Sequence, residues 1–150
     1  MNDLGARPVF FVKDTPRALQ YYTGTLGFNV DWTHEEKGRP YVVQVSLFGL
    51  QIILNQLERP EDVRAGHGRI FVGLDDDQSA AVLQHVRSRA IPAAYTFWGA
   101  PTMAVHDLDR NEIFFWLSDS ERVKWQQAHA GAVAADPRDE DLGRPGNAGA

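Results

Sequence analysis

The chain has 150 residues, a formal net charge of −5 and no cysteine, and 43% of its residues are hydrophobic. This composition is typical of one packed domain or two small fused halves, and it excludes disulfides, thiolate metal sites and cysteine nucleophiles. The chain has no basic stripe that would bind nucleic acid and no apolar stretch of the ~20 residues that span a bilayer, so we expect it to bind neither nucleic acid nor a membrane. It also has no signal-peptide pattern, so we expect a cytoplasmic protein.

Residues 7–56 are predicted to form a first unit with the order strand, helix, strand, strand, strand. The segment 7–13, rich in Val and Phe, predicts the first strand, and Asp14 or Thr15 is suited to cap the helix that follows. Further strands are expected over 28–34, 41–48 and 50–55, separated by Gly-containing turns. The polar segment 56–66 is predicted to link this unit to a second one.

Residues 67–118 repeat the same order. "FVGLDDDQSAAVLQHV" follows "FFVKDTPRALQYY" after about 60 residues, the kind of spacing that marks an internal duplication. A half of this size buries little apolar surface alone, so the two halves must pack together, and the groove between them is the natural place for a ligand. The sequence therefore predicts an α+β protein built from two tandem βαβββ units.

The C-terminal part differs from both halves. We expect one domain over 1–120, an additional helix over 119–135 and a disordered tail over 136–150, because the tail is rich in Pro, Gly and charge and has no apolar periodicity.

Two segments resemble a known family. "RPVFFVKDTPRALQYYTGTLGFNVDW" and "WGAPTMAVHDLDRNEIFF" are similar to the opening and closing motifs of the glyoxalase, bleomycin-resistance and extradiol-dioxygenase superfamily, the vicinal oxygen chelate fold. Leu108 and Arg110 stand where the family's closing motif has proline and glycine. The resemblance extends over 7–117, and it implies that the strands of both units curl around a shared cavity.

Members of this family that bind metal place His, Gln or Glu on the first and last strands of each unit. The corresponding positions here are Arg7, Ile53, Gly68 (with His67 adjacent) and Phe114. Arginine stays protonated, and hydrocarbon side chains have no lone pair, so these positions cannot hold a divalent ion. We therefore expect no metal, no cofactor and no catalytic residue.

The resemblance and the strand pattern together suggest a ligand-binding wall of aromatic side chains with few charges. Glu112, Phe114 and Trp116 are predicted to share one strand face. The candidate ligand-binding residues are Trp32, Phe48, His67, Phe97, Trp98, Glu112, Phe114 and Trp116. Core packing is an alternative explanation for the aromatic residues, and His67 is also typical of an exposed linker. The "DLDRN" segment lacks the calcium-loop residues, so Asp107, Asp109 and Asn111 are interpreted as turn residues.

The predicted function is metal-free binding of an aromatic or cationic small molecule, such as a bleomycin-type antibiotic, which would give resistance by sequestration. The chain is most similar to the metal-free bleomycin-resistance branch of the family. That resemblance implies a homodimer, and Pro8 matches a position that promotes exchange of the first strand between subunits in that branch. One alternative is a lyase, isomerase or dioxygenase whose metal is held by His34, His67, His106 and Glu112. Another is an interaction module without a pocket.

Overall fold

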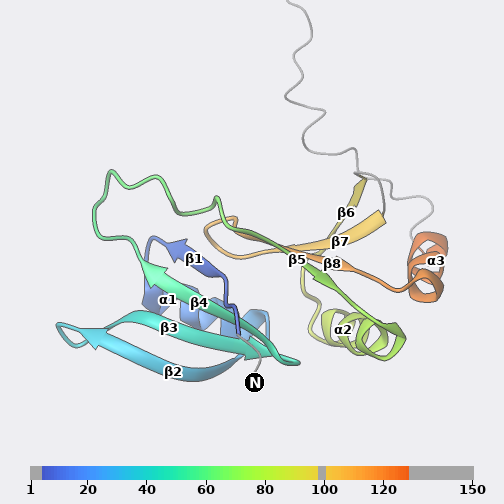
Figure 1. Ribbon diagram of the computed structural model, residues 1–150, viewed down its shortest axis with the longest axis horizontal. Helices are drawn as coiled ribbons and strands as arrows, with labels where there is room; N and C mark the ends of the chain where they lie inside the picture. Colours follow the sequence, from blue (N-terminus) through green and yellow to red (C-terminus); the bar gives the residue numbers. More distant parts are fainter. Residues whose placement is uncertain (1–4, 98–100, 129–150) are drawn as a thin grey trace, which may run out of the picture.

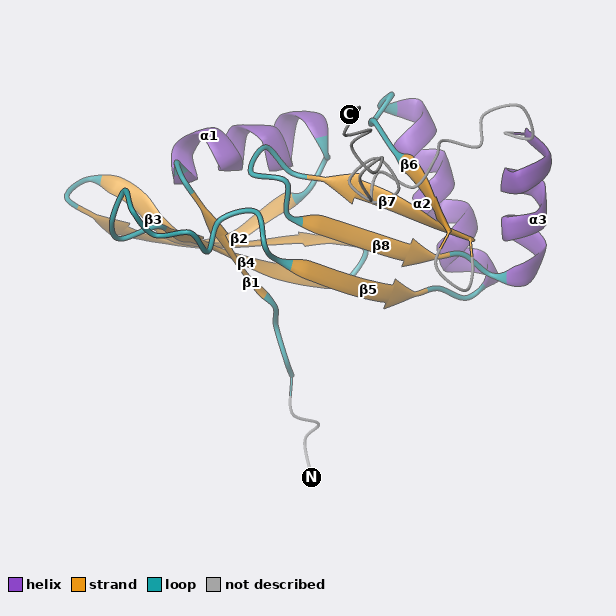
Figure 2. Ribbon diagram, turned by 90° about the horizontal axis from the view of Figure 1, so that it is seen from above, coloured by secondary structure: helices purple, strands orange, loops and turns teal. Residues whose placement is uncertain are grey.

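The computed structural model describes residues 5–97 and 101–128. Two four-stranded sheets lie side by side, and α1 and α2 run along the same side of the molecule (Figures 1 and 2). Each half has the order βαβββ, which confirms the predicted α+β class and the internal duplication. None of the helices in the described part of the chain is long and apolar enough to cross a membrane.

The first half comprises β1 (Val9–Val12), α1 (Thr15–Gln20), η1 (Tyr21–Thr25), β2 (Asn29–Glu36), β3 (Arg39–Leu47) and β4 (Leu50–Gln56). Its sheet has the order β1-β4-β3-β2, with β1 parallel to β4 and the other pairs antiparallel. Asp14 rather than Thr15 caps α1, since its carboxylate accepts a hydrogen bond from the Arg17 amide. The predicted helix continues through η1, a π-helical turn.

The second half comprises β5 (Arg69–Gly73), α2 (Asp76–Ser88), β6 (Ala94–Phe97), β7 (Pro101–His106) and β8 (Glu112–Trp116). Its sheet repeats the first one, with the order β5-β8-β7-β6 and β5 parallel to β8. The helix α2 begins at Asp76, directly after a reciprocal capping box formed by Asp75 and Gln78. A further helix, α3, covers Asp119–Ala128. The rest of the predicted 119–135 helix and the 136–150 tail lie outside the described residues.

One hydrophobic core joins the two halves. Alternate residues of the strands point into it, so each sheet has one face against the helices. Its largest fully buried members include Phe10, Leu26, Ile52, Met103 and Ile113, which come from both halves. A single shared core explains how two units that are individually too small can form a stable fold.

The turn before β8 fastens the halves together. Asn111 is fully buried; its Oδ1 accepts hydrogen bonds from the amides of Gly66 and Gly68, and its Nδ2 donates to the Phe11 carbonyl and to Asp107. The Tyr22 hydroxyl donates to Asp107 at 3.0 Å. The predicted turn role of these residues is thereby confirmed, and it extends to linking the two halves.

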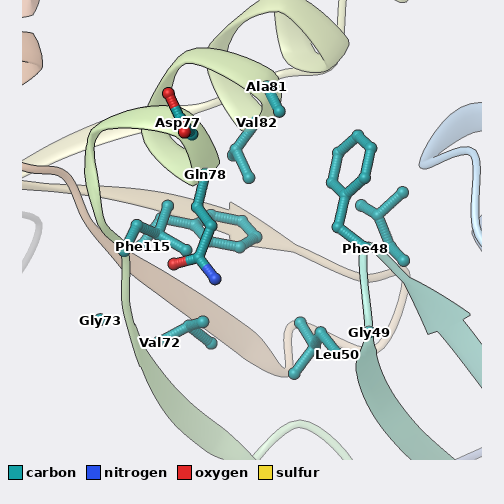
Figure 3. A pocket seen from close by; sticks show the side chains of 12 residues that line it. Phe48, Gly49, Leu50, Val72, Gly73, Asp77, Gln78, Ala81, Val82 and Phe115 are labelled. Carbon is teal, nitrogen blue, oxygen red and sulfur yellow. The ribbon is translucent and has the colours of Figure 1, made fainter.

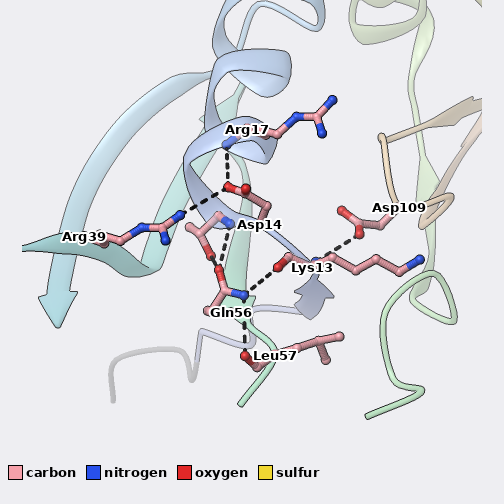
Figure 4. Close-up of polar contacts among 8 residues, drawn as sticks. Lys13, Asp14, Arg17, Arg39, Gln56, Leu57 and Asp109 are labelled. Atoms are coloured by element: carbon pink, nitrogen blue, oxygen red, sulfur yellow. Dashed lines mark hydrogen bonds and ion pairs between the residues drawn. The ribbon is translucent and has the colours of Figure 1, made fainter. Parts of the chain in front are cut away.

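Three further hydrogen bonds, made by Asp109 and Gln56, fix the start of α1 against this junction (Figure 4). The Lys13 amide donates to Asp109 at 3.0 Å, and Gln56 spans the turn by donating to the Lys13 carbonyl and accepting from the Thr15 amide. The polar groups of the chain between β1 and α1 are therefore satisfied from both halves.

Candidate functional site: the open faces of the two sheets

Each sheet has a second face that the helices do not cover. Strand alternation places the partners of core residues there, and several of them are large, apolar and exposed: Val9 (46%), Trp32 (43%), Phe71 (43%) and Trp116 (41%). We call these surfaces the first and second open faces, after the sheet to which each belongs. Exposed apolar side chains gathered on one surface indicate a site of binding.

Aromatic rings dominate the second open face. The Phe71 ring on β5 meets the Trp116 indole on β8 edge to face, with centroids 5.1 Å apart. Phe114 on β8 lies directly opposite Phe71 in the register of the sheet, but it is only 4% exposed. The Arg69 guanidinium lies 5.0 Å from its ring centroid.

The charges at the edge of this aromatic surface are already paired. Arg69 donates to the Glu112 carboxylate at 2.9 Å, and His106 Nε2 lies 3.3 Å from the other oxygen of that carboxylate. His106 and Asp107 bind to different partners, His106 to Glu112 and Asp107 to Tyr22 and Asn111, so they do not form an acid–base pair. Because Glu112 is held from two sides, it is less available to a ligand cation than the sequence suggested.

The first open face has the same arrangement, but its arginine binds a neutral amide in place of a carboxylate. Val9 pairs with Ile53 as Phe71 pairs with Phe114, so Arg7 and Gln51 are the counterparts of Arg69 and Glu112. The Arg7 Nε donates to the Gln51 Oε1 at 2.8 Å, as Arg69 does to Glu112. The duplication has therefore kept the arginine and exchanged its acceptor.

The first open face also carries a polar group on β2, the strand at the opposite edge of the sheet from β1. The Asp31 carboxylate on β2 accepts hydrogen bonds from Gln44 Nε2 and Ser46 Oγ, both at 2.8 Å. These two bonds hold the pKa of Asp31 below its ordinary value, and the charge of Arg7 adds to the effect. Trp32, the next residue, is 43% exposed and pairs with Gln44, one of the two residues that bind Asp31.

A separate cavity of about 550 Å³ opens between the halves on the helix side (Figure 3). Its walls are apolar and come from the β3–β4 turn, the end of β5, α2 and β8, with Asp77 and Gln78 of α2 as polar members. Phe48 contributes its ring from the turn, where it is 61% exposed and meets His85 edge to face. None of the exposed residues Trp32, Phe71 and Trp116 of the open faces lines this cavity.

The predicted site residues fall into different places. Glu112, Phe114 and Trp116 do share the second open face, Trp32 lies on the first, and Phe48 lies at the junction cavity. His67 is exposed in the linker. The side chain of Phe97 and all of Trp98 lie outside the described residues.

Sequence reasoning missed three members of the open faces: Phe71, Arg69 and Asp31. Strand alternation could have found Phe71 and Arg69, because they are two residues apart on β5 and therefore share one face. They pair there with Phe114 and Glu112. Asp31 carries no such signal. Its orientation depends on a β-bulge, which a regular alternation pattern does not reveal.

The family's metal positions do not fit a metal here. Arg7 bonds to Gln51, and Ile53 and Phe114 present hydrocarbon. The register makes Arg69, not Gly68, the counterpart of Arg7, because one residue fewer separates Phe71 from the helix cap Asp75 than separates Val9 from the cap Asp14. Within residues 5–97 and 101–128 there is no group of three or more His, Asp or Glu side chains arranged around a common point.

The fold has clear relatives among solved structures. The bleomycin-binding protein of bleomycin-producing Streptomyces verticillus, solved with copper(II)-bleomycin, superimposes with a TM-score of 0.58 at 18% identity, covering 79% of this chain and 99% of that one. TnmS3, an antibiotic-binding protein from Streptomyces sp. CB03234, gives 0.52 at 18%, covering 79% and 100%. Lactoylglutathione lyase from Agrobacterium tumefaciens gives 0.51 at 15%, covering 76% and 92%.

At these identities the likeness establishes the shared fold and leaves the ligand open. No curated protein matches the sequence. The family described as "Glyoxalase superfamily protein" matches residues 5–122, which is most of the chain and includes both βαβββ units. The chain therefore belongs to the glyoxalase superfamily.

Proposed function

We propose that this protein binds a small molecule with an aromatic or cationic group, such as a bleomycin-type antibiotic, and sequesters it without a metal of its own. The observation that supports this most is the second open face, where Phe71 and Trp116 present exposed rings beside charges that are already paired. Flat ring systems stack on such a surface, and burying apolar area contributes about 25 cal/mol per Å² before association costs.

The proposal fits what is known of two structural relatives, one bound to copper(II)-bleomycin and one described as antibiotic-binding. It also explains why the metal positions of the family have been replaced. A ligand that only needs to be held requires no Lewis acid, and an apolar wall with Ile53 and Phe114 stacks rings better than a hydrated ion does. Sequestration in the cytoplasm would then protect a cell from the bound compound.

We further propose that the pocket is completed by a second copy of the chain. An open face is a single wall, whereas ligand pockets bury most of a ligand's surface. Every residue of β2 is exposed, and the apolar side chains on both open faces gain from being covered. A two-fold dimer would set the first open face of one subunit opposite the second open face of the other.

Strand exchange is a proposed feature of that dimer. Within this chain Pro8 accepts a hydrogen bond from the Ile53 amide, and β1 pairs with β4. Exchange would form the same pairing with the partner's β4, so it would preserve every hydrogen bond of the strand.

Analytical ultracentrifugation tests the dimer, and the expected species has twice the chain mass of 16.8 kDa. A monomer at the protein concentrations used for the binding titrations would contradict the proposed dimer.

Calorimetric titration with metal-free bleomycin tests the function. The protein is first treated with a chelator, and its metal content is measured before the titration. We expect saturable binding by chelator-treated protein, unchanged when Zn²⁺, Ni²⁺ or Fe²⁺ is restored. Binding that requires an added divalent ion, or no binding to any aromatic cation, would contradict the proposal.

A further inference from the structure

We propose that Asp31, with the Trp32 indole, is the residue pair that recognises the positive charge of the ligand. This inference rests on the proposed binding function and adds the part of the site that selects cations. The sequence analysis placed the carboxylate of Glu112 among the ligand-binding residues, and the geometry favours a different carboxylate on the other half of the chain.

The first observation is a β-bulge in β2. The register moves from Val30 opposite Val45 to Trp32 opposite Gln44, so Asp31 is the additional residue. Val45 belongs to the core, and Gln44 lies on the opposite side of β3. Because Asp31 bonds to Gln44 and Ser46, it lies on the same face as Trp32. Two consecutive residues thus share the first open face, which regular alternation forbids and a bulge permits.

The second observation is how the carboxylate is held. Gln44 and Ser46 donate to different oxygens of Asp31, so the group is oriented before any ligand arrives. Gln44 is only 4% exposed, and its Oε1 has no hydrogen-bond partner among the described residues, so the amide is held through its contact with Asp31. A carboxylate fixed in this way loses little conformational freedom when it binds a cation.

The third observation is the charge balance of the two faces. Glu112 on the second face is paired with Arg69 and His106. Asp31 makes no ion pair with any residue in the described part of the chain. Arg7 influences its pKa from a distance but directs its guanidinium to Gln51. A ligand ammonium or guanidinium group therefore finds an unpaired acceptor at Asp31.

The fourth observation is the exposed indole beside this acceptor. Trp32 is 43% exposed and follows Asp31 on the same face. A cation is attracted both to a carboxylate and to the face of an indole, and the two attractions reinforce each other when the groups are adjacent. The chemical class selected is an organic cation, an ammonium or guanidinium group attached to an aromatic body that stacks on the aromatic wall.

A matched pair of probes tests this assignment: 1-naphthylmethylamine, which is protonated at pH 7, and the neutral 1-naphthalenemethanol. Both are titrated into the full chain and followed by tryptophan fluorescence. We expect the wild-type protein to prefer the cation by about tenfold, the sum of an exposed cation–π contact and a charge contact. We expect Asp31→Asn to remove the charge contact and to lower the preference to about threefold, the share of the cation–π contact, while the neutral probe binds as before.

Two further variants sharpen the test. Ser46→Ala removes one of the bonds that orient the carboxylate and should reduce the preference partially, and Glu58→Gln removes an exposed charge elsewhere and should leave it unchanged. Both probes binding without a cation preference, or a preference that keeps its wild-type size in Asp31→Asn, would overturn this inference alone. Failure of both probes to bind would overturn it together with the proposed function. Thermal midpoints of all variants establish that each is folded.

Discussion

The two halves of this chain follow the same path but have diverged in their open faces and in their closing turns. The second half presents Phe71 and Trp116 beside a neutralised Glu112, whereas the first presents an unpaired carboxylate and an amide-bonded Arg7. The first half closes with a tight turn at Phe48 and Gly49, which have φ of 49° and 84°. The second closes with the buried turn around Asn111. The two halves therefore present different surfaces: the second open face offers aromatic rings for stacking, and the first open face offers a carboxylate without an ion-pair partner.

The largest expected effect is on stability and concerns the closing turns. Asn111→Ala leaves the amides of Gly66 and Gly68 and the Phe11 carbonyl without partners, which should cost about 3 kcal/mol of unfolding free energy. Asn55→Ala is the matched control, since Asn55 makes one long contact of 3.5 Å and should cost under ~1 kcal/mol. Urea unfolding measures both. Equal losses would mean that the turn does not fasten the halves.

The next effect concerns the stacking wall. Trp116→Ala removes the exposed indole and should weaken binding of bleomycin by about 30-fold, as expected for a central aromatic contact. Val63→Ala truncates an even more exposed apolar residue in the linker and should change nothing. Calorimetry gives both affinities. A Trp116→Ala variant that binds as the wild type does would remove the second open face from the site.

A smaller effect should arise from the paired arginines. Arg69→Gln frees the Glu112 carboxylate, so affinity for the cationic naphthyl probe should rise several-fold. Arg7→Gln frees only the neutral Gln51, so it should produce no such gain. The two titrations are read side by side. If the affinity of both variants for the cationic probe rose equally, the loss of a positive charge alone would explain the change. The difference between Glu112 and Gln51 as partners of the two arginines would then have no effect on binding.

The smallest effect is a pH dependence at the junction. Burial raises the pKa of Asp107, and hydrogen bonds from Asn111 and Tyr22 oppose this only in part. The folded state thus holds the proton more tightly than the unfolded chain, and this residue's contribution to stability rises as pH falls through the raised pKa toward 3.8. The unfolding free energy of wild type minus that of Asp107→Asn should therefore increase on acidification. A decrease would reverse the sign assigned here.

Local rules predicted most of the fold. Periodicity gave both βαβββ units, and Asp14 and the charged turn at Gly38 lie where their residue types favour caps and turns. The shared face of Glu112, Phe114 and Trp116 followed from alternation alone. These features depend on neighbours in sequence, which a single chain displays.

The rest of the site depends on contacts between distant residues. The bulge at Asp31 becomes visible only when β2 is aligned with β3, and the pairing that neutralises Glu112 requires the register of β5 against β8. The counterpart of Arg7 is Arg69 and not Gly68, because one residue fewer lies between Phe71 and the cap of α2 than between Val9 and the cap of α1. No local pattern specifies these alignments, because many registers satisfy the same alternation.

The central claim is that an aromatic ligand stacks on the open faces without a metal. Fluorine NMR of chelator-treated protein labelled with 5-fluorotryptophan tests it most directly, since the chain has 4 tryptophans and each can be assigned by substitution to phenylalanine. During titration with metal-free bleomycin, the account predicts that the resonances of Trp116 and Trp32 shift and saturate together. Binding that leaves both resonances unmoved would contradict it.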